Sequence, residues 1–322
     1  MRVSVPHVTD TPPEAVTRDS DGLRDALDQR LPARTLDRNL LIGTWNIRHV
    51  GGPTEQWRAG DDDDSPKRDL HSIRVVAEII RRFDVVAIQE IRGDLKALRP
   101  DWGFVLTDVT RGDTGNDERL GFVFDRRTTR ISGLAGELVV PTNEFDHIDP
   151  DALDRQFART PYAVAFESGG ETFVLVTLHV LWGDRPEERT PELRAIAEWL
   201  DEWARDVNAW DHNLIALGDF NIDRRGDERY DAFVSTGLEV PADLHAVPRT
   251  IFADPGDPGS HFYDQIAWFT GDAGQPALSL DYVRGGSFDF VDVTLPRRDL
   301  TRASLSWRIS DHYPLWAAFS LR

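Results

Sequence analysis

The stretch NLIALGDFN, residues 213–221, is an apolar run that ends in two polar side chains. Residues 214–217 are all apolar, which is typical of a strand buried on both faces. A buried strand would normally stay apolar, because an unpaired buried carboxylate costs free energy. Asp219 and Asn221 therefore indicate a strand whose end reaches a functional site.

Other apolar segments end in the same way, with a chemically capable polar residue at or near the strand's C-terminal end. These residues are Asn46 in TWNIR, Glu90 in AIQEIR, His179 in VTLHV and Asp264 in YDQI. One such residue is easily a satisfied polar group of the core. Five such segments together favour a shared site, because ligand sites in α/β proteins collect at strand ends.

The rest of the chain reads as many short strands and a few long helices. We expect strands at residues 40–47, 84–91, 102–109, 119–125, 136–140, 162–167, 172–180, 213–220, 263–269 and 314–321. Helices are expected from Ser65–Pro66 to about residue 80, at residues 187–210 and at residues 229–235. This pattern predicts an α/β fold, with two packed sheets and helices outside, in a single domain over residues 39–322. Residues 1–38 read as a polar, partly disordered N-terminal extension with one short helix around residues 21–30.

The composition narrows the class of protein. The 322 residues carry a formal net charge of −19 and no cysteine, so disulfides and thiolate metal sites are excluded. No apolar run approaches the roughly 18 residues of a membrane span, and the N-terminus lacks the apolar core of a secretory signal, so we expect a cytoplasmic protein without membrane contact. The charge could reflect a salt-tolerant or GC-rich source. If the protein binds nucleic acid, we expect a divalent cation to bridge the contact.

The ordered motifs resemble a known family. TWNIR, IQEIR, GDFN, YDQI and SDHYP follow the order of the endonuclease/exonuclease/phosphatase superfamily, and the longer segments most resemble deoxyribonuclease I-like nucleases over about residues 40–322. The resemblance implies a four-layer α/β/β/α sandwich, with two mixed sheets face to face and helices outside. It also implies hydrolysis of a phosphoester by an in-line water.

A divalent metal site is the first part of that chemistry. Glu90 would bind the ion through its carboxylate and Asn46 through its amide oxygen, and the resemblance adds Asp311. Oxygen ligands without cysteine favour Mg²⁺, Mn²⁺ or Ca²⁺ over zinc. The ion would act as a Lewis acid on the phosphoryl oxygen.

Proton transfer is the second part. His312 is the candidate general base, because imidazole titrates near neutral pH, and the resemblance pairs it with Asp264. Asp219 would orient the attacking water, and Asn221 would donate to a phosphoryl oxygen.

A second histidine could serve the leaving group. The resemblance pairs His179 with Glu118 as a possible acid for the leaving oxygen. We expect the other seven histidines to be ordinary core or surface residues.

Three arginines lie beside these motifs. Arg48 and Arg159 are candidate phosphate contacts, because a guanidinium group matches phosphate oxygens in a bidentate fork. Arg92 lies where the resemblance implies a contact with the minor groove of DNA.

Several features leave the substrate open. Asn116 stands where the family tends to carry an aromatic residue, and residues 51–64 are longer and more acidic than expected beside a duplex. Trp57 and Trp182 could be replacement stacking platforms or simply packed side chains. We expect a monomeric nuclease that acts on DNA rather than RNA. The alternatives are a phosphoesterase for a small-molecule or lipid phosphate, such as a phosphoinositide or sphingomyelin, and an inactive binding scaffold.

Overall fold

The computed structural model describes residues 10–50, 54, 56–59, 68–91, 101–108, 118–138, 159–180, 182–183, 185–206, 213–257 and 259–321. The helices are α1 (Glu14–Arg30), α2 (Leu70–Ile80), α4 (Arg189–Arg205), α5 (Glu228–Phe233) and α6 (Arg302–Ser306), with short 3-10 helices η1 (Pro186–Glu188) and η2 (Ala242–Ala246). The strands are β1 (Asn39–Val50), β2 (Val85–Ile91), β3 (Trp102–Leu106), β4 (Arg119–Asp125), β5 (Thr129–Glu137), β6 (Tyr162–Ser168), β7 (Glu171–His179), β8 (Leu214–Asp219), β9 (Leu238–Glu239), β10 (Asp264–Phe269), β11 (Asp281–Ser287) and β12 (Leu315–Ser320).

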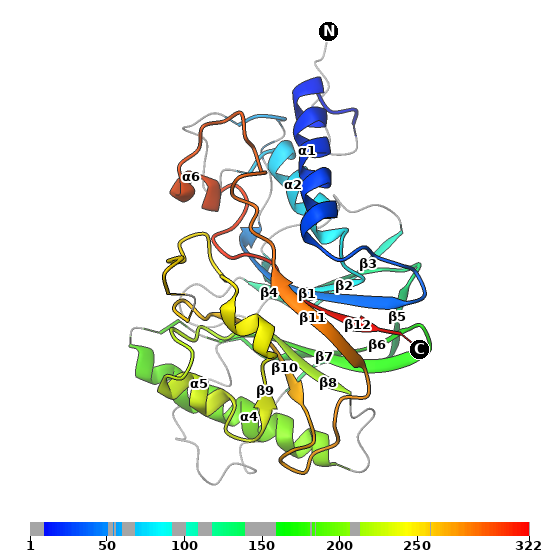
Figure 1. Ribbon diagram of the computed structural model, residues 1–322, viewed down its shortest axis with the longest axis vertical. Helices are drawn as coiled ribbons and strands as arrows, with labels where there is room; N and C mark the ends of the chain where they lie inside the picture. The colour runs from blue at the N-terminus through cyan, green and yellow to red at the C-terminus, as the bar shows by residue number, and fades with distance from the viewer. Residues whose placement is uncertain are drawn as a thin grey trace.

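The strands form two mixed six-stranded sheets. Their orders are β11-β12-β1-β2-β4-β3 and β5-β6-β7-β8-β10-β9. Figure 1 shows the sheets stacked, with α1 and α2 covering the first sheet and α4 and α5 covering the second. The expected four-layer α/β/β/α sandwich is confirmed.

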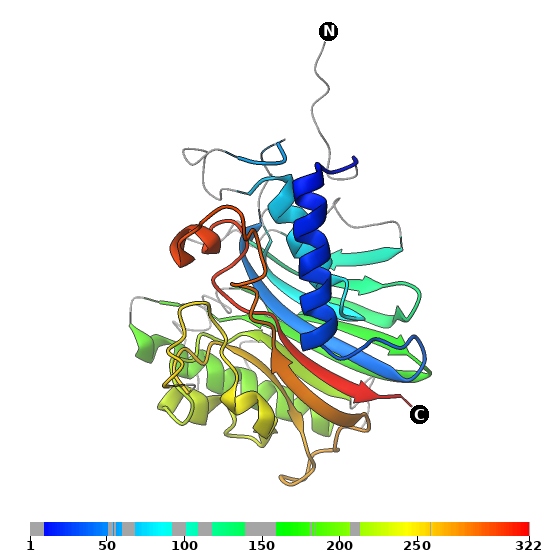
Figure 2. The same cartoon turned by 45° about the horizontal axis from the view of Figure 1, so that its top comes forward.

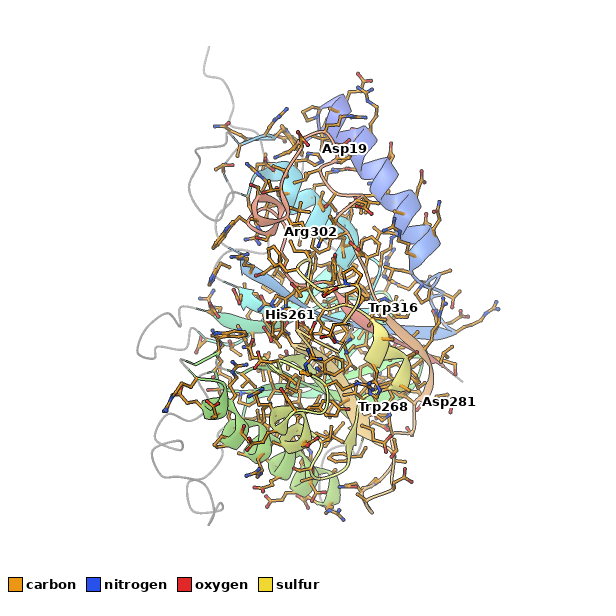
Figure 3. The ribbon with its side chains drawn as sticks, turned by 60° about the vertical axis from the view of Figure 1, so that its left-hand side comes forward. Asp19, His261, Trp268, Asp281, Arg302 and Trp316 are labelled. Carbon is orange, nitrogen blue, oxygen red and sulfur yellow. The ribbon has the colours of Figure 1, made fainter. Side chains whose placement is uncertain are left out.

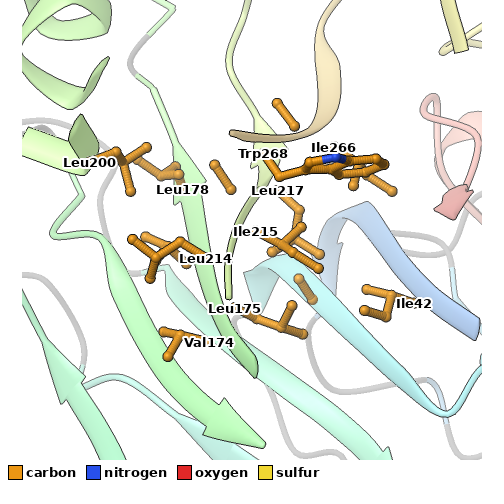
Figure 4. Close-up of a cluster of buried hydrophobic side chains, with 14 of the residues drawn as sticks. Ile42, Val174, Leu175, Leu178, Leu200, Leu214, Ile215, Leu217, Ile266 and Trp268 are labelled. Atoms are coloured by element: carbon orange, nitrogen blue, oxygen red, sulfur yellow. The ribbon is translucent and has the colours of Figure 1, made fainter. Parts of the chain in front are cut away.

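Apolar side chains fill the spaces on both sides of each sheet. Leu214, Ile215, Ala216 and Leu217 of β8 are all buried, as expected for a strand covered on both faces. In Figure 4, Leu214 lies on the side of Leu200 from α4, whereas Ile215 lies toward Ile42 of β1. The opening stretch is therefore a central strand that contributes to two apolar layers.

Strand direction places the functional residues at one edge of the sandwich. Each sheet contains one parallel pair, β1 with β2 and β7 with β8, so the C-terminal ends of both strands in a pair reach the same edge. The antiparallel neighbours β4, β10 and β12 begin at that edge, so Asp264, expected near the C-terminal end of a strand, is instead the first residue of β10. Figure 2 shows the two sheets packed face to face. Strands β1 and β2 of the first sheet contact β8 of the second.

The N-terminal helix differs from the prediction. Helix α1 begins at Glu14, seven residues before the expected start, and packs against α2. Leu23 and Leu27 are buried in the apolar cluster beneath the first sheet. The extension expected over residues 1–38 is thus wrong for α1, which belongs to the core because its apolar residues recur on one face. Residues 1–9 lie outside the described residues.

Other element boundaries differ in smaller ways. Helix α2 begins at Leu70 with Asp69 as its N-cap, whose side chain accepts from the backbone N–H of Ser72, so the start predicted at Ser65–Pro66 is wrong. Strand β5 begins at Thr129 rather than at residue 136. Strands β9 and β11 were missed. Strand β9 has only two residues, and β11 is an edge strand that contains two glycines. Among the described residues, no helix is long and apolar enough to cross a membrane.

Candidate active site

Two groups of carboxylates and histidine meet at the edge where the parallel pairs end. The first, which we call the Glu90 cluster, consists of His49, Glu90 and Glu118. His49 Nδ1 lies 3.2 Å from Glu118 Oε1 and 3.3 Å from Glu90 Oε2. The backbone N–H of His49 also donates to Glu90 Oε2, at 3.1 Å. One acid from β2 and one from the start of β4 therefore share a histidine from β1.

The backbone at this cluster is irregular. The β1–β2 register shifts after Asn46, and the β2–β4 register shifts after Ile88. Arg48, His49 and Glu90 have φ values of 41°, 51° and 61°, in the left-handed region that non-glycine residues rarely adopt. Irregularities of this kind turn side chains out of the pleat. They are the local reason that Glu90 lies beside His49 at the strand ends.

His179 and Arg159 join the Glu90 cluster from the second sheet. Arg159 forms an ion pair with Glu118 at 2.8 Å, and His179 Nδ1 lies 3.6 Å from Glu118 Oε2. The other ring nitrogen, His179 Nε2, lies 3.6 Å from Asp219 Oδ2. His179 thus stands between the first cluster and the second.

The second group, which we call the Asp264 cluster, consists of Asp219, Asp264 and His312. Asp219 and Asp264 are register partners on β8 and β10. His312 Nδ1 lies 2.7 Å from Asp264 Oδ2, and its Nε2 lies 3.8 Å from Asp219 Oδ2. The backbone N–H of Asn221 donates to Asp219 Oδ1 at 3.0 Å, which fixes that carboxylate.

The chain that carries His312 is held by buried groups. The indole N–H of Trp45 donates to the carbonyl of His312 at 2.8 Å, and the hydroxyl of Ser310 donates to the carbonyl of Asn46 at 2.6 Å. The buried guanidinium of Arg68 donates to the carbonyls of His49 and Ile309, at 2.9 and 2.7 Å. These bonds tie the end of β1 to the segment before β12, so both clusters rest on one rigid frame.

Burial and neighbouring charges shift the pKa values in opposite directions. Burial, followed by the charge of Arg159, lowers the pKa of His179 well below its usual value. Although burial opposes it, the charges of Asp264 and Asp219 raise the pKa of His312 well above its usual value. Burial raises the pKa of Asp219 to about 6. The shifts therefore favour the neutral form of His179 and the charged form of His312.

A cavity of about 600 Å³ opens over both clusters. Its floor is formed by Glu90, Glu118, His179, Asp219 and His312, and it continues toward Trp182, Phe252, His261 and Tyr263. In Figure 3 the labelled His261 lies between the α1 end of the molecule, marked by Asp19, and the β10 strand, marked by Trp268. The site is thus an open cleft at the level where the two sheets meet.

The family follows from comparison with known proteins. Residues 43–312, which include both clusters, match the model of the endonuclease/exonuclease/phosphatase family. The chain belongs to this family. It is therefore a hydrolase of the endonuclease/exonuclease/phosphatase type, and enzymes of this family generally depend on a divalent metal.

Individual relatives differ in function. A deoxyribonuclease from Thioalkalivibrio sp. (strain K90mix) is 29% identical over 205 residues, which are 60% of this chain and 48% of that protein. The match thus covers about half the length of that relative. A mannosyl-6-phosphatase of Bacteroides thetaiotaomicron superposes with a TM-score of 0.53 at 20% identity, over 86% of this chain and 98% of that one. D. rerio TDP2, solved with a single-strand DNA product, superposes with a TM-score of 0.51 at 15% identity, over 87% and 98%. These structures share the fold.

Most residues predicted for this family site come together. The predicted residues that line the cavity are Glu90, Glu118, Arg159, His179, Asp219, Asn221, Asp311 and His312. Asp264 contacts His312 and lies beside the cavity. Asn46 is buried beside them, where its Nδ2 donates to Glu90 Oε1 at 2.9 Å and to Asp219 Oδ2 at 3.0 Å. Its oxygen accepts from the backbone N–H of Arg48, so Asn46 presents its nitrogen, not its oxygen, to Glu90.

The remaining predicted residues have more varied surroundings. Arg48 pairs with Asp311 at 3.1 Å, and its Cζ lies 3.6 Å from the centroid of the Trp307 ring. Asp311 therefore faces Arg48 and is not one of the residues whose ligand atoms converge on Glu90. Arg92, Asn116 and residues 61–64 lie outside the described residues.

Sequence reasoning missed two important residues. His49 was expected to be an ordinary core or surface histidine, but β1 continues through Val50 and its irregular end turns His49 to Glu90, which makes His49 a candidate site residue. Its place two residues after the TWNI segment was the available signal. Arg68, which is fully buried, lies where the sequence predicted the first turn of a helix, and no sequence signal pointed to a role at the site.

Proposed function

We propose that the protein is a divalent-metal-dependent phosphodiesterase that hydrolyses nucleic acid, DNA in preference to RNA, by in-line attack of water. One observation carries this proposal. His312 is held by Asp264 at 2.7 Å while its Nε2 faces Asp219 at 3.8 Å, at the floor of a cleft that also contains the Glu90 cluster. The similarity to a deoxyribonuclease supports the choice of a nucleic-acid diester.

The residues present fit a divalent cation. Glu90, Glu118 and His49 offer ligand atoms that lie within 4.8 Å of one another. Burial, followed by the charge of Glu118, raises the pKa of Glu90, as expected when two carboxylates share a partly buried site. A cation such as Mg²⁺, Mn²⁺ or Ca²⁺ would stabilise both carboxylates in their ionised form. Bound there, it would supply Lewis-acid polarisation of a phosphoryl oxygen. Asp311, which also lines the cleft, remains a candidate ligand.

Asp219 is the proton acceptor that we propose for the attacking water. Although burial opposes it, the charges of Asp264 and Asp219 raise the pKa of His312, which favours Asp219 as the acceptor, and the base role expected for His312 is the alternative that a pH profile tests. Asp219, with a pKa of about 6, is ionised at neutral pH and lies within reach of a water held beside His312. His312, kept charged by Asp264, would donate a hydrogen bond to that water or to a phosphoryl oxygen.

Arg159, Asn221 and His179 would contact the phosphate and the leaving oxygen. Arg159 carries a guanidinium beside Glu118, and Asn221 keeps one amide N–H free to donate after bonding the carbonyl of Val180 at 2.6 Å. His179, which rests neutral, would donate one N–H to the leaving oxygen and would act as an acid only after gaining a proton. Arg48 would contact phosphate only by leaving Asp311.

A second candidate function is hydrolysis of a small phosphoester. The cleft volume of about 600 Å³ lies within the range of small-ligand sites. A sugar phosphate or a lipid headgroup phosphate would occupy such a volume, and the same residues would act on it.

A substrate panel tests these proposals. Plasmid DNA, single-stranded DNA, RNA, nitrophenyl phosphodiesters, nitrophenyl phosphate and mannose 6-phosphate are each incubated with Mg²⁺, Mn²⁺ or Ca²⁺, with EDTA and the His312→Ala variant as controls. We expect cleavage of DNA and of the diesters that EDTA abolishes. Hydrolysis of monoesters alone would reject the phosphodiesterase proposal in favour of the second candidate.

A further inference from the structure

Aromatic side chains form one wall of the cleft. Six large apolar side chains are well exposed in the described part of the chain, and two of them, Trp182 (51% exposed) and Phe252 (46% exposed), line the catalytic cavity. Tyr263 and His261 line it beside them. We call Trp182, Phe252, His261 and Tyr263 the aromatic wall.

The aromatic wall is continuous with the catalytic histidine. The Tyr263 ring lies 5.7 Å from the His312 ring, and the rings of Trp182 and His261 pack edge-on against Tyr263 at 5.6 and 5.5 Å. The series Trp182–Tyr263–His312 therefore spans two ring-to-ring contacts. A ligand group that contacts Trp182 could therefore belong to the same molecule as a phosphate that lies over His312.

Trp182 is fixed in place although half of its surface is open. The buried Arg189 donates through Nε to the carbonyl of Trp182 at 2.7 Å, and its guanidinium lies 4.4 Å from the centre of the Trp182 ring. Arg189 is itself held by an ion pair with Asp223 at 3.1 Å. A tryptophan that only packed would bury most of its ring, whereas this one is oriented by buried polar groups and left open. It is prepared to stack against a ligand.

The charge distribution indicates how a polyanion would be bound. With a net charge of −19, the protein would gain little from long-range attraction to a phosphate backbone. The arginines of the cleft region are also neutralised, Arg159 by Glu118 and Arg189 by Asp223. Beyond the phosphate that the cation contacts, affinity would depend on contacts that do not require phosphate charge, and stacking of a base on an aromatic ring is such a contact.

We propose that the aromatic wall binds an unpaired nucleobase next to the scissile phosphate, so that the enzyme prefers single-stranded to duplex nucleic acid. This inference rests on the proposed phosphodiesterase function. In a duplex the faces of each base are covered by its neighbours, so a base can stack on Trp182 only after leaving the helix. Unpaired strands present that face without the cost of unstacking.

Two nitrophenyl diesters separate this inference from the proposed function. Thymidine 5′-(4-nitrophenyl) phosphate carries a base beside the scissile bond, whereas methyl 4-nitrophenyl phosphate has the same leaving group and no base. We expect wild-type kcat/KM to be higher for the thymidine ester, with the difference mainly in KM. Trp182→Ala should lower the ratio of the two kcat/KM values about 5- to 100-fold. Trp182→Phe, which keeps an aromatic ring, should retain much of the wild-type ratio.

Matched variants and a strand substrate complete the test. Phe252→Ala should also lower the ratio, whereas Phe104→Ala, which truncates an equally exposed phenylalanine on β3, should not. Wild type should cut a single-stranded oligonucleotide faster than the same sequence in a duplex, and one abasic residue beside the cut should remove that advantage.

The outcomes are distinguishable. If the wild type hydrolyses neither diester with any of the three metals, the proposed function fails. If it hydrolyses both esters with a ratio that Trp182→Ala does not change, or cuts duplex faster than single strands, the function stands and the aromatic-wall proposal is overturned. Hydrolysis of mannose 6-phosphate that depends on Trp182, with an unchanged diester ratio, would overturn it in favour of a sugar.

Discussion

The Glu90 cluster and the Asp264 cluster contain the same kinds of residues in different surroundings. Each has two carboxylates and one histidine whose ligand atoms lie within 4.8 Å of one another. In the Asp264 cluster both carboxylates are fully buried and paired with a charged histidine. In the Glu90 cluster, His49 and Glu90 are partly exposed and the backbone adopts left-handed φ values.

The difference shows how the setting decides what one set of side chains does. In the Asp264 cluster, burial raises the pKa values of both carboxylates, and the charge of His312 opposes this shift. The Glu90 cluster has an excess of negative charge near Glu90 and opens to solvent, so it suits an incoming cation. We therefore propose that the Asp264 cluster handles the proton and the Glu90 cluster binds the metal; three variants test this division, and a fourth tests the role of α1.

The largest effect is expected from Asp264→Asn. The amide keeps the shape of the side chain but removes the charge that keeps His312 protonated and oriented. We expect kcat to fall about 10²- to 10⁴-fold with the fold retained. Steady-state kinetics and circular dichroism measure both quantities. A fall smaller than tenfold would show that the Asp264 cluster does not handle the proton.

The pH profile gives the next largest effect. If Asp219 accepts the proton, wild-type kcat/KM should rise with pH through about 6, because only the ionised carboxylate is active. Asp219→Asn should lower the rate by about 100-fold and remove that rise. A wild-type profile that instead rises only well above pH 7 would return the base role to His312, whose pKa is raised.

His49→Ala should have an intermediate effect, on the metal rather than on the proton. Loss of a nitrogen ligand or of its hold on Glu90 and Glu118 should weaken Mn²⁺ binding about 10- to 100-fold. Electron paramagnetic resonance of free Mn²⁺ during titration measures this without turnover. His245→Ala, which changes a partly buried histidine of η2, is the matched control. Unchanged Mn²⁺ affinity in His49→Ala would place the ion elsewhere.

The smallest effect on catalysis is expected from Leu27→Ala in α1. Leu27 is fully buried beneath the first sheet, so the cavity should lower the free energy of unfolding by about 2–5 kcal/mol. Neither cluster touches α1, so kcat should change less than twofold at a temperature where the variant is folded. Chemical denaturation measures the first quantity. Little change in stability would mean that α1 is an appendage after all, as residues 1–38 were first interpreted.

Much of the fold could be predicted because its signals are local. The central strands are continuous apolar runs, and β4 lies at the predicted residues 119–125. The edge strand β11 carries two glycines and few buried residues, so its apolar signal is weak. The start of α2 was misplaced because Ser65 was taken as the N-cap, whereas Asp69, inside the expected helix, is the N-cap in the structure.

The site residues also divide into those that the sequence predicted and those that it did not. Asp219, Asp264, His179 and Glu90 were predicted because a polar residue at the end of a buried strand is costly without a purpose. His49 and Arg68 were not, because their roles depend on contacts with β2, β4 and the segment before β12.

The sequence by itself determined the central strands, the family and the inventory of acids, histidines and arginines. Only the tertiary structure decided their division into two clusters, the opposite pKa shifts of His312 and His179, and the exposure of Trp182. The physical reason is that apolar periodicity is a property of neighbouring residues, whereas pKa values and exposure depend on burial and charge contributed by distant strands. Asp219 and His312 are 93 positions apart in the chain, yet the charge of each shifts the pKa of the other.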